Sequence, residues 1–538
     1  MRPLQDWRHP LTWSRSWTTL FGIVLAFLAG LLLIRLSPLE GAALVGLLAI
    51  VVATLIEPMV GLGTALFVGP LKAYLSAELP QIPAQIGHAF VALALGSWLI
   101  RRLSEQKVHL DSTLSPLSLS LLGFLGAVLL SLWDAVDLVA YGIPELVKWV
   151  EILLLFVLVS ECLTADTPSA SRRGLGGPAS RGPHRPLWWL MFTVLSPGVF
   201  QAMIGIWQFA LRGEGPDHFR VLGGDFFRAY GTFEQPNPYG GYLGLTAALA
   251  LGTTVGLAWE RLAGDGDSRS TARDSERRKK GTNHPISALS VLRSEDWAFY
   301  VLGGGAALVM VVALVASWSR GAWIGFGSAL LMMAAALPRK AIWSVLLVTA
   351  LILGGIGLYV SGQLPAPIAD RLTSFVQDIH LEDVRGVPIN DANYAVVERL
   401  AHWQAALSMF RHRLWTGVGF GCYEAAYPTF SLINWPIALG HAHNVYLNLA
   451  AETGLIGLGA YLILWAVVIW QTWRLTRRAR GLVRGIGVGL IGVWTHLSVH
   501  HLLDNLYVNN VHLHIGVLLG LAAFLIQWTN RTIQGYGH

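Results

Sequence analysis

The chain has 538 residues, of which 54% are hydrophobic and only 13% are charged, whereas soluble domains carry about 25% charged residues. This composition excludes a water-soluble fold and indicates a protein with many membrane-spanning helices. The net charge of +6 does not indicate a nucleic-acid partner, because the basic residues stand in short runs beside hydrophobic segments rather than on one soluble face.

Apolar windows of about 17 to 25 residues predict transmembrane helices. In chain order these windows lie at 17–36, 39–57, 61–78, 83–100, 113–133, 140–163, 187–210, 237–258, 297–317, 321–338, 341–361, 443–471, 484–503 and 511–529. The sequence therefore predicts an all-α polytopic membrane protein with about 14 transmembrane helices. The window 61–78 is the least regular, because Pro70, Lys72 and Glu78 interrupt it, and a re-entrant segment is the alternative there.

The arginine-rich connections test this topology, since such connections mark the cytoplasmic side. With the N-terminus in the cytoplasm, all of them fall on that side. They contain Arg101 and Arg102; Arg172, Arg173, Arg181 and Arg185; Arg277, Arg278, Lys279 and Lys280; Arg339 and Lys340; and Arg474, Arg477, Arg478, Arg480 and Arg484, with Arg531 near the C-terminus. We therefore expect a multi-pass membrane protein with both termini in the cytoplasm.

The same reading divides the chain into four regions. Residues 1–186 hold six helices and a cytoplasmic linker, and residues 187–361 hold five helices with a charged cytoplasmic loop at 259–296. Residues 362–442 form a large outer loop, and residues 443–538 hold the last three helices. The segments 164–186 and 259–296 are rich in Ser, Gly, Pro and mixed charge, which predicts flexible linkers. The outer loop is longer than a connector needs to be, so we expect it to be ordered and functional.

A first candidate residue is Arg320, in Ser317-Trp318-Ser319-Arg320-Gly321 at the outer end of the ninth helix. An arginine at the membrane boundary is costly unless it is solvated or paired. The alternative is an interfacial anchor whose charged end reaches the headgroups, and for a lone arginine this alternative is favoured.

A second candidate is an amphipathic helix inside the outer loop. Apolar residues recur there at helical spacing, at Val396, Leu400, Trp403, Leu407 and Phe410. Arg399 lies next to this stripe and His402 lies further round, so both side chains can face a cleft between the loop and the membrane domain. A helix that lies on the bilayer with a solvated polar face is an equally good explanation.

A third candidate is the stretch from Gly440 to Leu447, which opens the twelfth helix at the outer surface. His441 and His443 are separated by two positions, so they do not share a helical face, and a two-histidine metal site on a helix is disfavoured. An imidazole near neutral pH can act as a general base. Taken alone, an interfacial histidine is more often structural.

Further polar residues are weaker candidates. The turn Phe233-Glu234-Gln235-Pro236-Asn237-Pro238 signals by itself only a change of direction. Glu452 in the twelfth helix and Asp504 at the end of the thirteenth are acids in or near the membrane. Such acids are functional candidates, but each could also be paired for structural reasons.

Together these motifs resemble the O-antigen ligase and O-antigen polymerase superfamily. The resemblance lies in Arg320 of Ser-Arg-Gly, the Phe233 to Pro238 turn, Glu398-Arg399-Leu400 followed by Trp403, Gly417-Val418-Gly419, His443-Asn444, and Glu452-Thr453-Gly454-Leu455-Ile456-Gly457. The ending His500-His501-Leu502-Leu503-Asp504-Asn505 also resembles members labelled as bicarbonate transporters. The motifs cover about 230 to 510, and their order and spacing are more specific than any single motif.

The resemblance implies a glycosyltransferase of a bacterial cytoplasmic (inner) membrane, with an architecture of the GT-C type and a large helical periplasmic loop. Such an enzyme transfers a glycan from a polyprenyl diphosphate carrier to a lipid or sugar hydroxyl on the periplasmic face, with inversion and without a metal ion or other cofactor. His443 would then be the general base, and Arg320 and Arg399 would bind the diphosphate. Supporting candidates are Asn444, Glu452, His441, His402, Asn237 and Asp504. The partners implied are the polyprenyl diphosphate-linked donor, a lipid or glycan acceptor and membrane lipids, with no nucleic acid.

The resemblance leaves alternatives open. A ligase and a polymerase differ in their acceptor, and the sequence does not separate them. A transporter of bicarbonate or another small anion is the competing class, but it should place ionisable residues near the bilayer midplane, whereas the conspicuous charges here lie at the outer surface. A structural scaffold explains the motif set least well. His441 is the rival of His443 as the base, and we prefer His443 because Asn444 and the downstream glycines accompany it.

Overall fold

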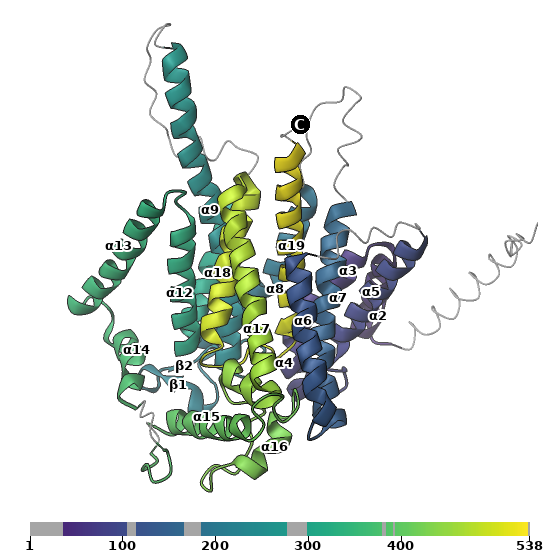
Figure 1. Ribbon diagram of the computed structural model, residues 1–538, viewed down its shortest axis with the longest axis vertical. Coiled ribbons are helices and arrows are strands. Elements are labelled where there is room, and N and C mark those ends of the chain that lie inside the picture. Colours follow the sequence, from purple (N-terminus) through teal and green to yellow (C-terminus); the bar gives the residue numbers. More distant parts are fainter. Residues whose placement is uncertain are drawn as a thin grey trace, which may run out of the picture.

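The computed structural model describes residues 36–104, 115–165, 184–276, 299–378, 383–390 and 393–535. Within these ranges the chain forms a bundle of long helices that run roughly along one direction (Figure 1). The bundle helices are α2 (Pro38–Ile56), α3 (Pro58–Val68), α5 (Ile86–Ser104), α6 (Pro116–Ser131), α7 (Ile143–Ala165), α8 (His184–Ala210), α9 (Pro236–Glu276), α11 (Gly304–Ala316), α12 (Arg320–Ala336), α13 (Ala341–Val360), α17 (Val445–Arg478), α18 (Gly481–His500) and α19 (Val511–Gly535). The predicted all-α polytopic class is confirmed for this part of the chain.

The predicted number of spans is tested only in part. The first predicted span, 17–36, lies outside the described residues but for its last position, and each of the others coincides with a helical segment. Ten segments are long and apolar enough to cross a membrane, counted over the described part of the chain. Helix α7 carries four charged residues, and α11 and α12 are shorter, so these three are not among the ten. The figure of about 14 spans stays a prediction.

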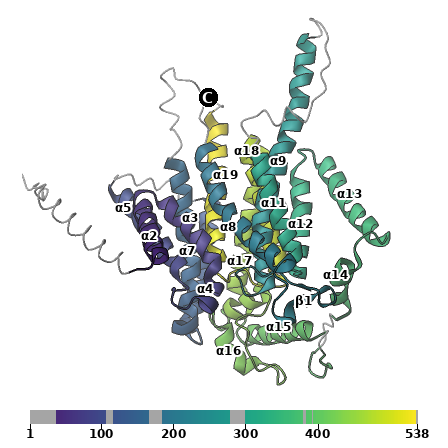
Figure 2. The ribbon, with the colours of Figure 1, turned by 180° about the vertical axis from the view of Figure 1, so that it is seen from behind.

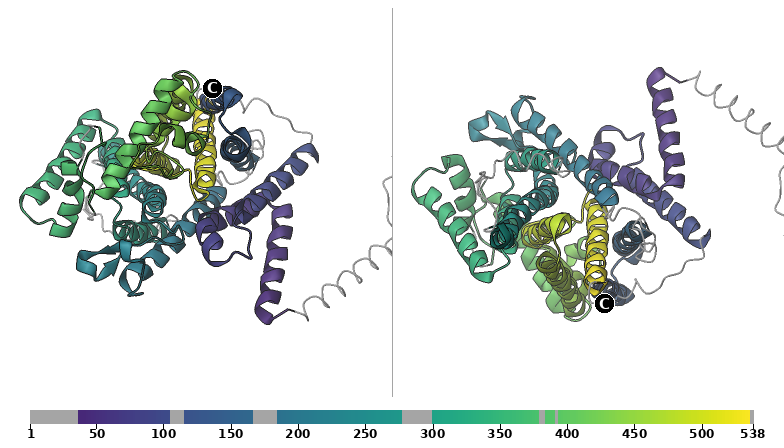
Figure 3. Two further views of the ribbon diagram at one scale, coloured as in Figure 1. Left: turned by 90° about the horizontal axis from the view of Figure 1, so that it is seen from below. Right: turned by 90° about the horizontal axis from the view of Figure 1, so that it is seen from above.

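The centre of the bundle is formed by α18, α19 and the part of α9 up to Leu262, whose side chains are mostly buried. Helices α9 and α18 pack closely because glycines face each other, as is common between helices in lipid. A Cβ added at Gly252 would lie 2.5 Å from the Cα of Gly489. At the periphery, α2 and α13 expose large apolar side chains, and the end-on views of Figure 3 place them at opposite sides of the bundle. This distribution suits a protein whose outer surface faces lipid.

One end of the bundle gathers the arginines that mark the cytoplasmic side in the sequence. Nη2 of Arg339 and Nη1 of Arg484 each lie 3.0 Å from a carboxylate oxygen of Glu260. Arg101 contacts Glu57 at this end of the neighbouring helices, with 3.5 Å between Nη1 and Oε2. The arginine-rich connections in the described ranges therefore do share one end, which is the upper end in Figures 1 and 2.

The irregular segment 61–78 runs the length of the bundle. It forms α3, a 3-10 turn at Gly69–Leu71 and α4 (Lys72–Glu78). Its start lies at the arginine-rich end, where Glu57 contacts Arg101. Its far part lies at the opposite end, where the hydroxyl of Thr232 donates to the carbonyl of Pro70. Gly69 and Pro70 interrupt the helix without reversing its direction. The segment therefore continues from one end of the bundle to the other, as the prediction of a spanning segment requires.

One local expectation needs correction. The helix predicted to end at 258 continues as α9 to Glu276, and no proline interrupts it there. Residues 277–298 of the predicted linker lie outside the described part. The outer segment 211–236 contains regular structure. It carries a short antiparallel hairpin, β1 (Arg220–Val221) with β2 (Phe226–Phe227), around Gly223 and Gly224, both with positive φ.

The large outer loop is helical, as expected. It contains α14 (Ala366–Asp378), α15 (Tyr394–His412) and α16 (Tyr423–Phe430). These helices lie with the β-hairpin at the end of the bundle opposite the arginine-rich connections (Figure 1). Because α15 packs against the start of α17, the loop encloses that end of the membrane helices.

Candidate functional site

The site begins at the tight turn between α11 and α12. The hydroxyl of Ser319 caps α12 by accepting from the backbone N–H of Ala322 at 3.4 Å. Trp318 has a φ of 55°, a left-handed conformation that a bulky residue adopts only under constraint. The turn points the carbonyls of Ser317 and Trp318 outward and starts α12 with Arg320. The short sequence thus places two acceptors and one guanidinium at the same end of the bundle.

The two carbonyls hold two further arginines. Arg228 follows strand β2, and its Nε donates to the Ser317 carbonyl at 3.0 Å. Its Nη2 donates to Oδ1 of Asn237 at the start of α9, also at 3.0 Å. Arg371 on α14 donates from Nε and Nη2 to the Trp318 carbonyl, both at 3.3 Å. Asn237 therefore serves to position Arg228.

Helix α15 confirms the predicted helix but corrects its buried face. Apart from Leu400, the residues that pack inward lie off the predicted stripe, and several are small; the buried residues are Val397, Leu400, Ala401, His402, Ala405, Ala406 and Met409. The alanines allow α15 to approach α17 closely, which larger side chains would prevent. Of the predicted stripe, Val396, Leu400 and Trp403 instead line a cavity together with Arg399.

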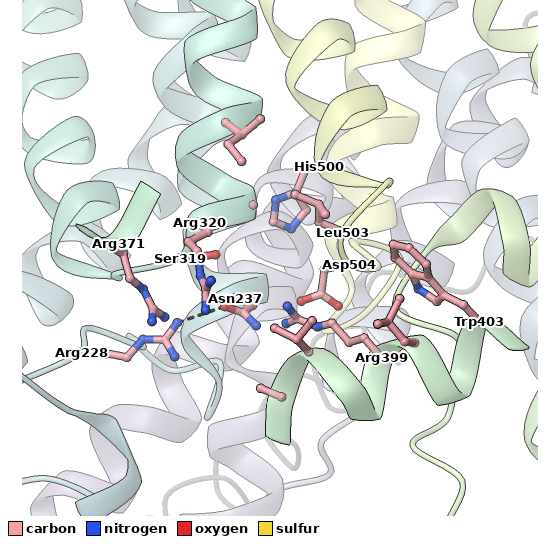
Figure 4. A pocket seen from close by; sticks show the side chains of 15 residues that line it. Arg228, Asn237, Ser319, Arg320, Arg371, Arg399, Trp403, His500, Leu503 and Asp504 are labelled. Atoms are coloured by element: carbon pink, nitrogen blue, oxygen red, sulfur yellow. Dashed lines mark hydrogen bonds between the residues drawn. The ribbon is translucent and has the colours of Figure 1, made fainter. Parts of the chain in front are cut away.

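That cavity, of about 190 Å³, opens between α12, α15 and the segment after α18. Four arginines from four separate segments line it: Arg228, Arg320, Arg371 and Arg399. Figure 4 shows Arg228, Arg320 and Arg371 on one side and Arg399 beside Asp504 on the other. His500 and Leu503 form the wall nearer the bundle. The cavity therefore combines an apolar wall with a concentrated positive charge.

Arginines outnumber acids on the wall of this cavity, where Asp504 is the acid. Burial, and then the charges of Arg371, Arg399 and Arg320, together lower the pKa of Arg228 to about 9. Burial and the charges of Arg320 and Arg399 likewise lower the pKa of Arg371 to about 10. The hydrogen bonds of Arg228 and Arg371 described above reach neutral oxygens. Half-buried guanidinium groups held in this way favour a polyanionic ligand.

His443 lies behind Asp504 rather than on the cavity wall. Its Nδ1 is 3.4 Å from Oδ1 of Asp504, and its φ of 52° is left-handed. Asn444, next in the chain, caps α17 by accepting from the backbone N–H groups of Tyr446 and Leu447, both at 3.0 Å. Burial opposes ionisation of Asp504, but the hydrogen bond from His443 and the charges of His443, His441 and Arg399 hold its pKa well below the usual range. The cap and the ion pair together fix the imidazole of His443.

His441 supports His443 in this arrangement. Its Nδ1 accepts from the backbone N–H of His443 at 3.0 Å, so that nitrogen carries no proton. Burial, and then the charge of His443, lowers the pKa of His441 to about 4. The ring is therefore neutral at pH 7 and has one nitrogen already in use.

A metal ion is the other ligand that this cluster could hold. Ligand atoms of His441, His443 and Asp504 lie within 4.8 Å of one another. Two imidazoles and one carboxylate are a common set of zinc ligands. The geometry by itself thus allows either a metal centre or a histidine base oriented by a carboxylate.

Residues 305–462 match the family model of O-antigen ligase. This stretch of the chain is similar to O-antigen ligases, which supports the superfamily that the motifs indicate. The helices that are long and apolar enough to cross a membrane indicate a multi-pass membrane protein. No curated protein matches the chain.

The range that matches the family model contributes most of the site but not all of it. The matched range runs from α11 into α17, so it includes Arg320, Arg371, Arg399 and His443. Arg228 and Asp504 lie outside it, before and after in the chain. The cavity is therefore completed by segments that flank the matched domain.

Glu452 and His402 lie outside the cavity and hold its framework. Oε1 of Glu452 accepts from the backbone N–H of Tyr423 at the start of α16, at 3.1 Å. The hydroxyl of Tyr423 lies 2.9 Å from Nδ1 of His402 and donates to the carbonyl of His402 at 3.1 Å. The His402 ring is buried and stacks on Tyr427 with 4.6 Å between ring centroids. The expectation that His402 faces a cleft is wrong, because its neighbours on α16 cover it.

Two glycines of the motif are required by the backbone and by close packing. Gly454 interrupts α17 with φ 62° and ψ −160°, a conformation open essentially to glycine. A Cβ there would lie 2.3 Å from the carbonyl carbon of Trp415, and one at Gly417 would lie 2.2 Å from that of Glu452. These glycines let the segment after α15 pack against the kink, which positions α16 and α15.

Sequence reasoning missed Arg228, Arg371 and His500 as cavity residues. Arg371 lies in an amphipathic segment, and nothing in that local pattern separates it from an ordinary surface arginine. Arg228 follows a Gly-Gly turn between short apolar pairs, which is a recognisable hairpin signal, but its contact with Ser317 bridges segments far apart in the chain. Only the folded arrangement brings these side chains together.

Proposed function

We propose that this protein is a membrane glycosyltransferase of the O-antigen ligase type. It transfers a glycan from a polyprenyl diphosphate carrier to a hydroxyl of a lipid or sugar acceptor, on the periplasmic face, as a step in lipopolysaccharide or related envelope assembly. The observation that carries the proposal is the arginine-lined cavity beside the Asp504–His443 pair. Its position at the end opposite the arginine-rich connections supports the periplasmic side.

The four arginines would bind the diphosphate of the donor. Each guanidinium offers a planar set of donors that matches phosphate oxygens. The apolar side chains of Val396, Leu400 and Trp403 in the same cavity suit the hydrocarbon next to the diphosphate. Stabilising the charge that develops on a leaving group is often the largest contribution to catalysis.

His443 would act as the general base through Nε2. Because its Nδ1 faces Asp504, the carboxylate holds the proton on Nδ1 and leaves the lone pair on Nε2, the arrangement by which an acid orients a catalytic histidine. As the acceptor oxygen attacks the anomeric carbon, Nε2 takes its proton. The bond between that carbon and the diphosphate oxygen breaks with inversion, and the diphosphate leaves with the electron pair, held by the arginines.

Asp504 is a poorer choice as the base, although it lines the cavity. A carboxylate whose pKa is held low takes up protons weakly at neutral pH. The same charges support catalysis without a metal ion. A dication at His441, His443 and Asp504 would be repelled by Arg399, which contributes to the electrostatic environment of both His441 and Asp504. A diphosphate leaving group also needs little help from a metal once several arginines neutralise it.

The test is glycan transfer by the purified full-length protein in lipid vesicles, from a polyprenyl diphosphate-linked oligosaccharide to lipid A core or to a second lipid-linked oligosaccharide. His443→Ala should lower the rate by about 10² to 10⁴ while the protein remains folded. His441→Asn keeps an acceptor for the His443 N–H and should lose less than about tenfold. Wild-type rates in His443→Ala would refute the assignment of the base, and bicarbonate uptake without transfer would refute the enzyme class.

The acceptor decides between ligase and polymerase within this proposal. Transfer to lipid A core identifies a ligase, and elongation of the lipid-linked glycan identifies a polymerase. Addition of Mg²⁺ or Mn²⁺ to chelator-washed protein should leave the rate unchanged. A rate that depends on either ion would show that the metal-free mechanism is wrong.

A further inference from the structure

A second polar cluster lies among α5, α7 and α19, away from the family match. Nδ1 of His88 on α5 is 2.7 Å from Oε1 of Glu151 on α7. Nε2 of His512 on α19 is 2.9 Å from Oε2 of the same carboxylate. The two imidazole rings stack with 5.8 Å between centroids. One carboxylate thus bridges two histidines that come from different helices.

The hydrogen bond on the far side of His88 constrains its protonation. Nε2 of His88 is 3.1 Å from Oδ1 of Asn510, and an amide oxygen only accepts hydrogen bonds, so Nε2 carries a proton. In the neutral ring Nδ1 then presents a lone pair to Glu151. A lone pair and a carboxylate oxygen at that distance repel each other unless a cation lies between them. The cation can be a second proton on His88 or a metal ion.

His512 meets Glu151 in a similar way. Its Nε2 faces a carboxylate oxygen at 2.9 Å, so a proton or a metal ion must be present there as well. Its Nδ1 makes no hydrogen bond within the described part of the chain, so the ring proton can lie on Nδ1 when Nε2 binds a metal ion. The ligand atoms of His88, Glu151 and His512 lie within 4.8 Å of one another. Their side chains are 27%, 12% and 1% exposed, so an ion can enter from the side of His88 and would then be largely enclosed.

We propose that His88, Glu151 and His512 bind a divalent transition-metal ion, with Zn²⁺ the best match. Two histidines and one glutamate are a known three-ligand set for zinc, with a fourth position open to water. The Asn510 oxygen on Nε2 of His88 is the outer contact that metal-bound histidines usually have, and it fixes the ring and its tautomer. Asn510 has a φ of 58°, and it packs next to Gly69. The site therefore has ligands on three helices and a built second contact.

The metal would tie together three helices that the sequence separates widely. His512 lies in the first turn of α19, directly after the segment 501–510 that carries Asp504. A bound ion would hold the end of that segment against α5 and α7. This inference does not depend on the proposed glycosyl transfer, since none of its residues takes part in it.

The experiment is zinc binding to the full-length protein in detergent, stripped with a chelator and titrated with ZnCl₂ against a chromophoric competitor. We expect about one ion per chain at this site. Glu151→Gln, which keeps the size of the side chain, and His512→Ala should weaken that binding by at least about 100-fold. Asn510→Gly tolerates the left-handed backbone and should weaken it by about 10- to 100-fold. Co²⁺ should give the visible absorption of a site with nitrogen and oxygen ligands.

Two controls separate this site from others. His218→Ala alters an exposed histidine and should leave binding unchanged. His443→Ala removes the other possible metal cluster and should also leave it unchanged. The inference is overturned if the folded wild-type protein binds no stoichiometric zinc. It is overturned equally if binding survives in Glu151→Gln and His512→Ala, or is lost in His443→Ala.

Discussion

Replacing Arg228 by glutamine should stabilise the protein and weaken donor binding at the same time. The pKa of Arg228 is lowered to about 9, by burial and by three neighbouring arginines, yet the group is still charged at pH 7. Lowering the pKa of an arginine this far corresponds to about 5 kcal/mol of disfavoured charge. The side chain is only partly buried, so solvent screening reduces this figure to about 2 kcal/mol.

Part of that gain is offset by lost hydrogen bonds. Glutamine can keep one bond, to the Ser317 carbonyl or to Asn237, and the other is worth about 1 kcal/mol. We therefore expect a net stabilisation of about 1 kcal/mol in Arg228→Gln. Loss of one charged contact to the diphosphate, worth about 1.5 to 3 kcal/mol, should raise the Kd of the donor by about 10- to 100-fold.

The assay combines thermal unfolding in detergent with binding of a polyprenyl diphosphate-linked glycan. Arg220→Gln is the matched control on the same hairpin, because Arg220 is half exposed and pairs with Asp217, and it should change unfolding by less than about 0.5 kcal/mol. The reasoning is refuted if Arg228→Gln is less stable than the wild type and binds the donor equally well. Arg228 would then be a structural anchor.

Three further predictions concern the orienting acid, the buried histidine and the helix kink. Asp504→Asn should lower transfer by about 10² to 10⁴ with little change in donor Kd, and an unchanged kcat would show that His443 needs no orientation. Burial, and then the charge of His443, lowers the pKa of His402 to about 4, below the value of about 6.5 in the unfolded chain. The contribution of His402 to stability is therefore full above pH 6.5 and is lost as the pH falls towards 4. Going from pH 7 to pH 5 should lower the free energy of unfolding by about 2 kcal/mol through His402. His402→Asn keeps a polar atom near the Tyr423 hydroxyl and does not titrate, so its unfolding should depend less steeply on pH. An identical slope would count against the assignment. Gly454→Ala should destabilise the protein by about 3 kcal/mol or more in denaturant unfolding. Gly459→Ala in the same helix is the control, because a Cβ there meets nothing within 4 Å, and it should be neutral or slightly stabilising. Equal effects of the two substitutions would mean that the kink is not required.

The positions of the helices could be predicted from the sequence because hydrocarbon allows few solutions. A chain in lipid must satisfy its backbone hydrogen bonds internally, so long apolar windows become helices whatever their neighbours are. The arginines predicted which connections share one end of the bundle, and in the described part Arg339 and Arg484 do meet there at Glu260. Local composition was less informative at helix ends, as the continuation of α9 to Glu276 shows.

Part of the site could be predicted for a different reason. Arg320, Arg399 and His443 stand in short motifs whose order resembles a family, and the fold brings the two arginines to one cavity with His443 behind Asp504. The roles of Glu452 and His402 could not be predicted in this way, because a buried acid or histidine has the same local pattern whether it meets substrate or a tyrosine of the next helix. Their contacts with Tyr423 decide that they support the framework.

The sequence by itself determined the class of protein, the course of most helices and the motifs that indicate the family, since each depends on residues close together in the chain. Only the tertiary structure added Arg228 and Arg371 to the cavity, assigned Asp504 to His443 and gathered His88, Glu151 and His512 around one point. These contacts join segments that are far apart in sequence. Side-chain charge and hydrogen bonding act over a few ångströms in space, and no local pattern records which distant residues will come that close.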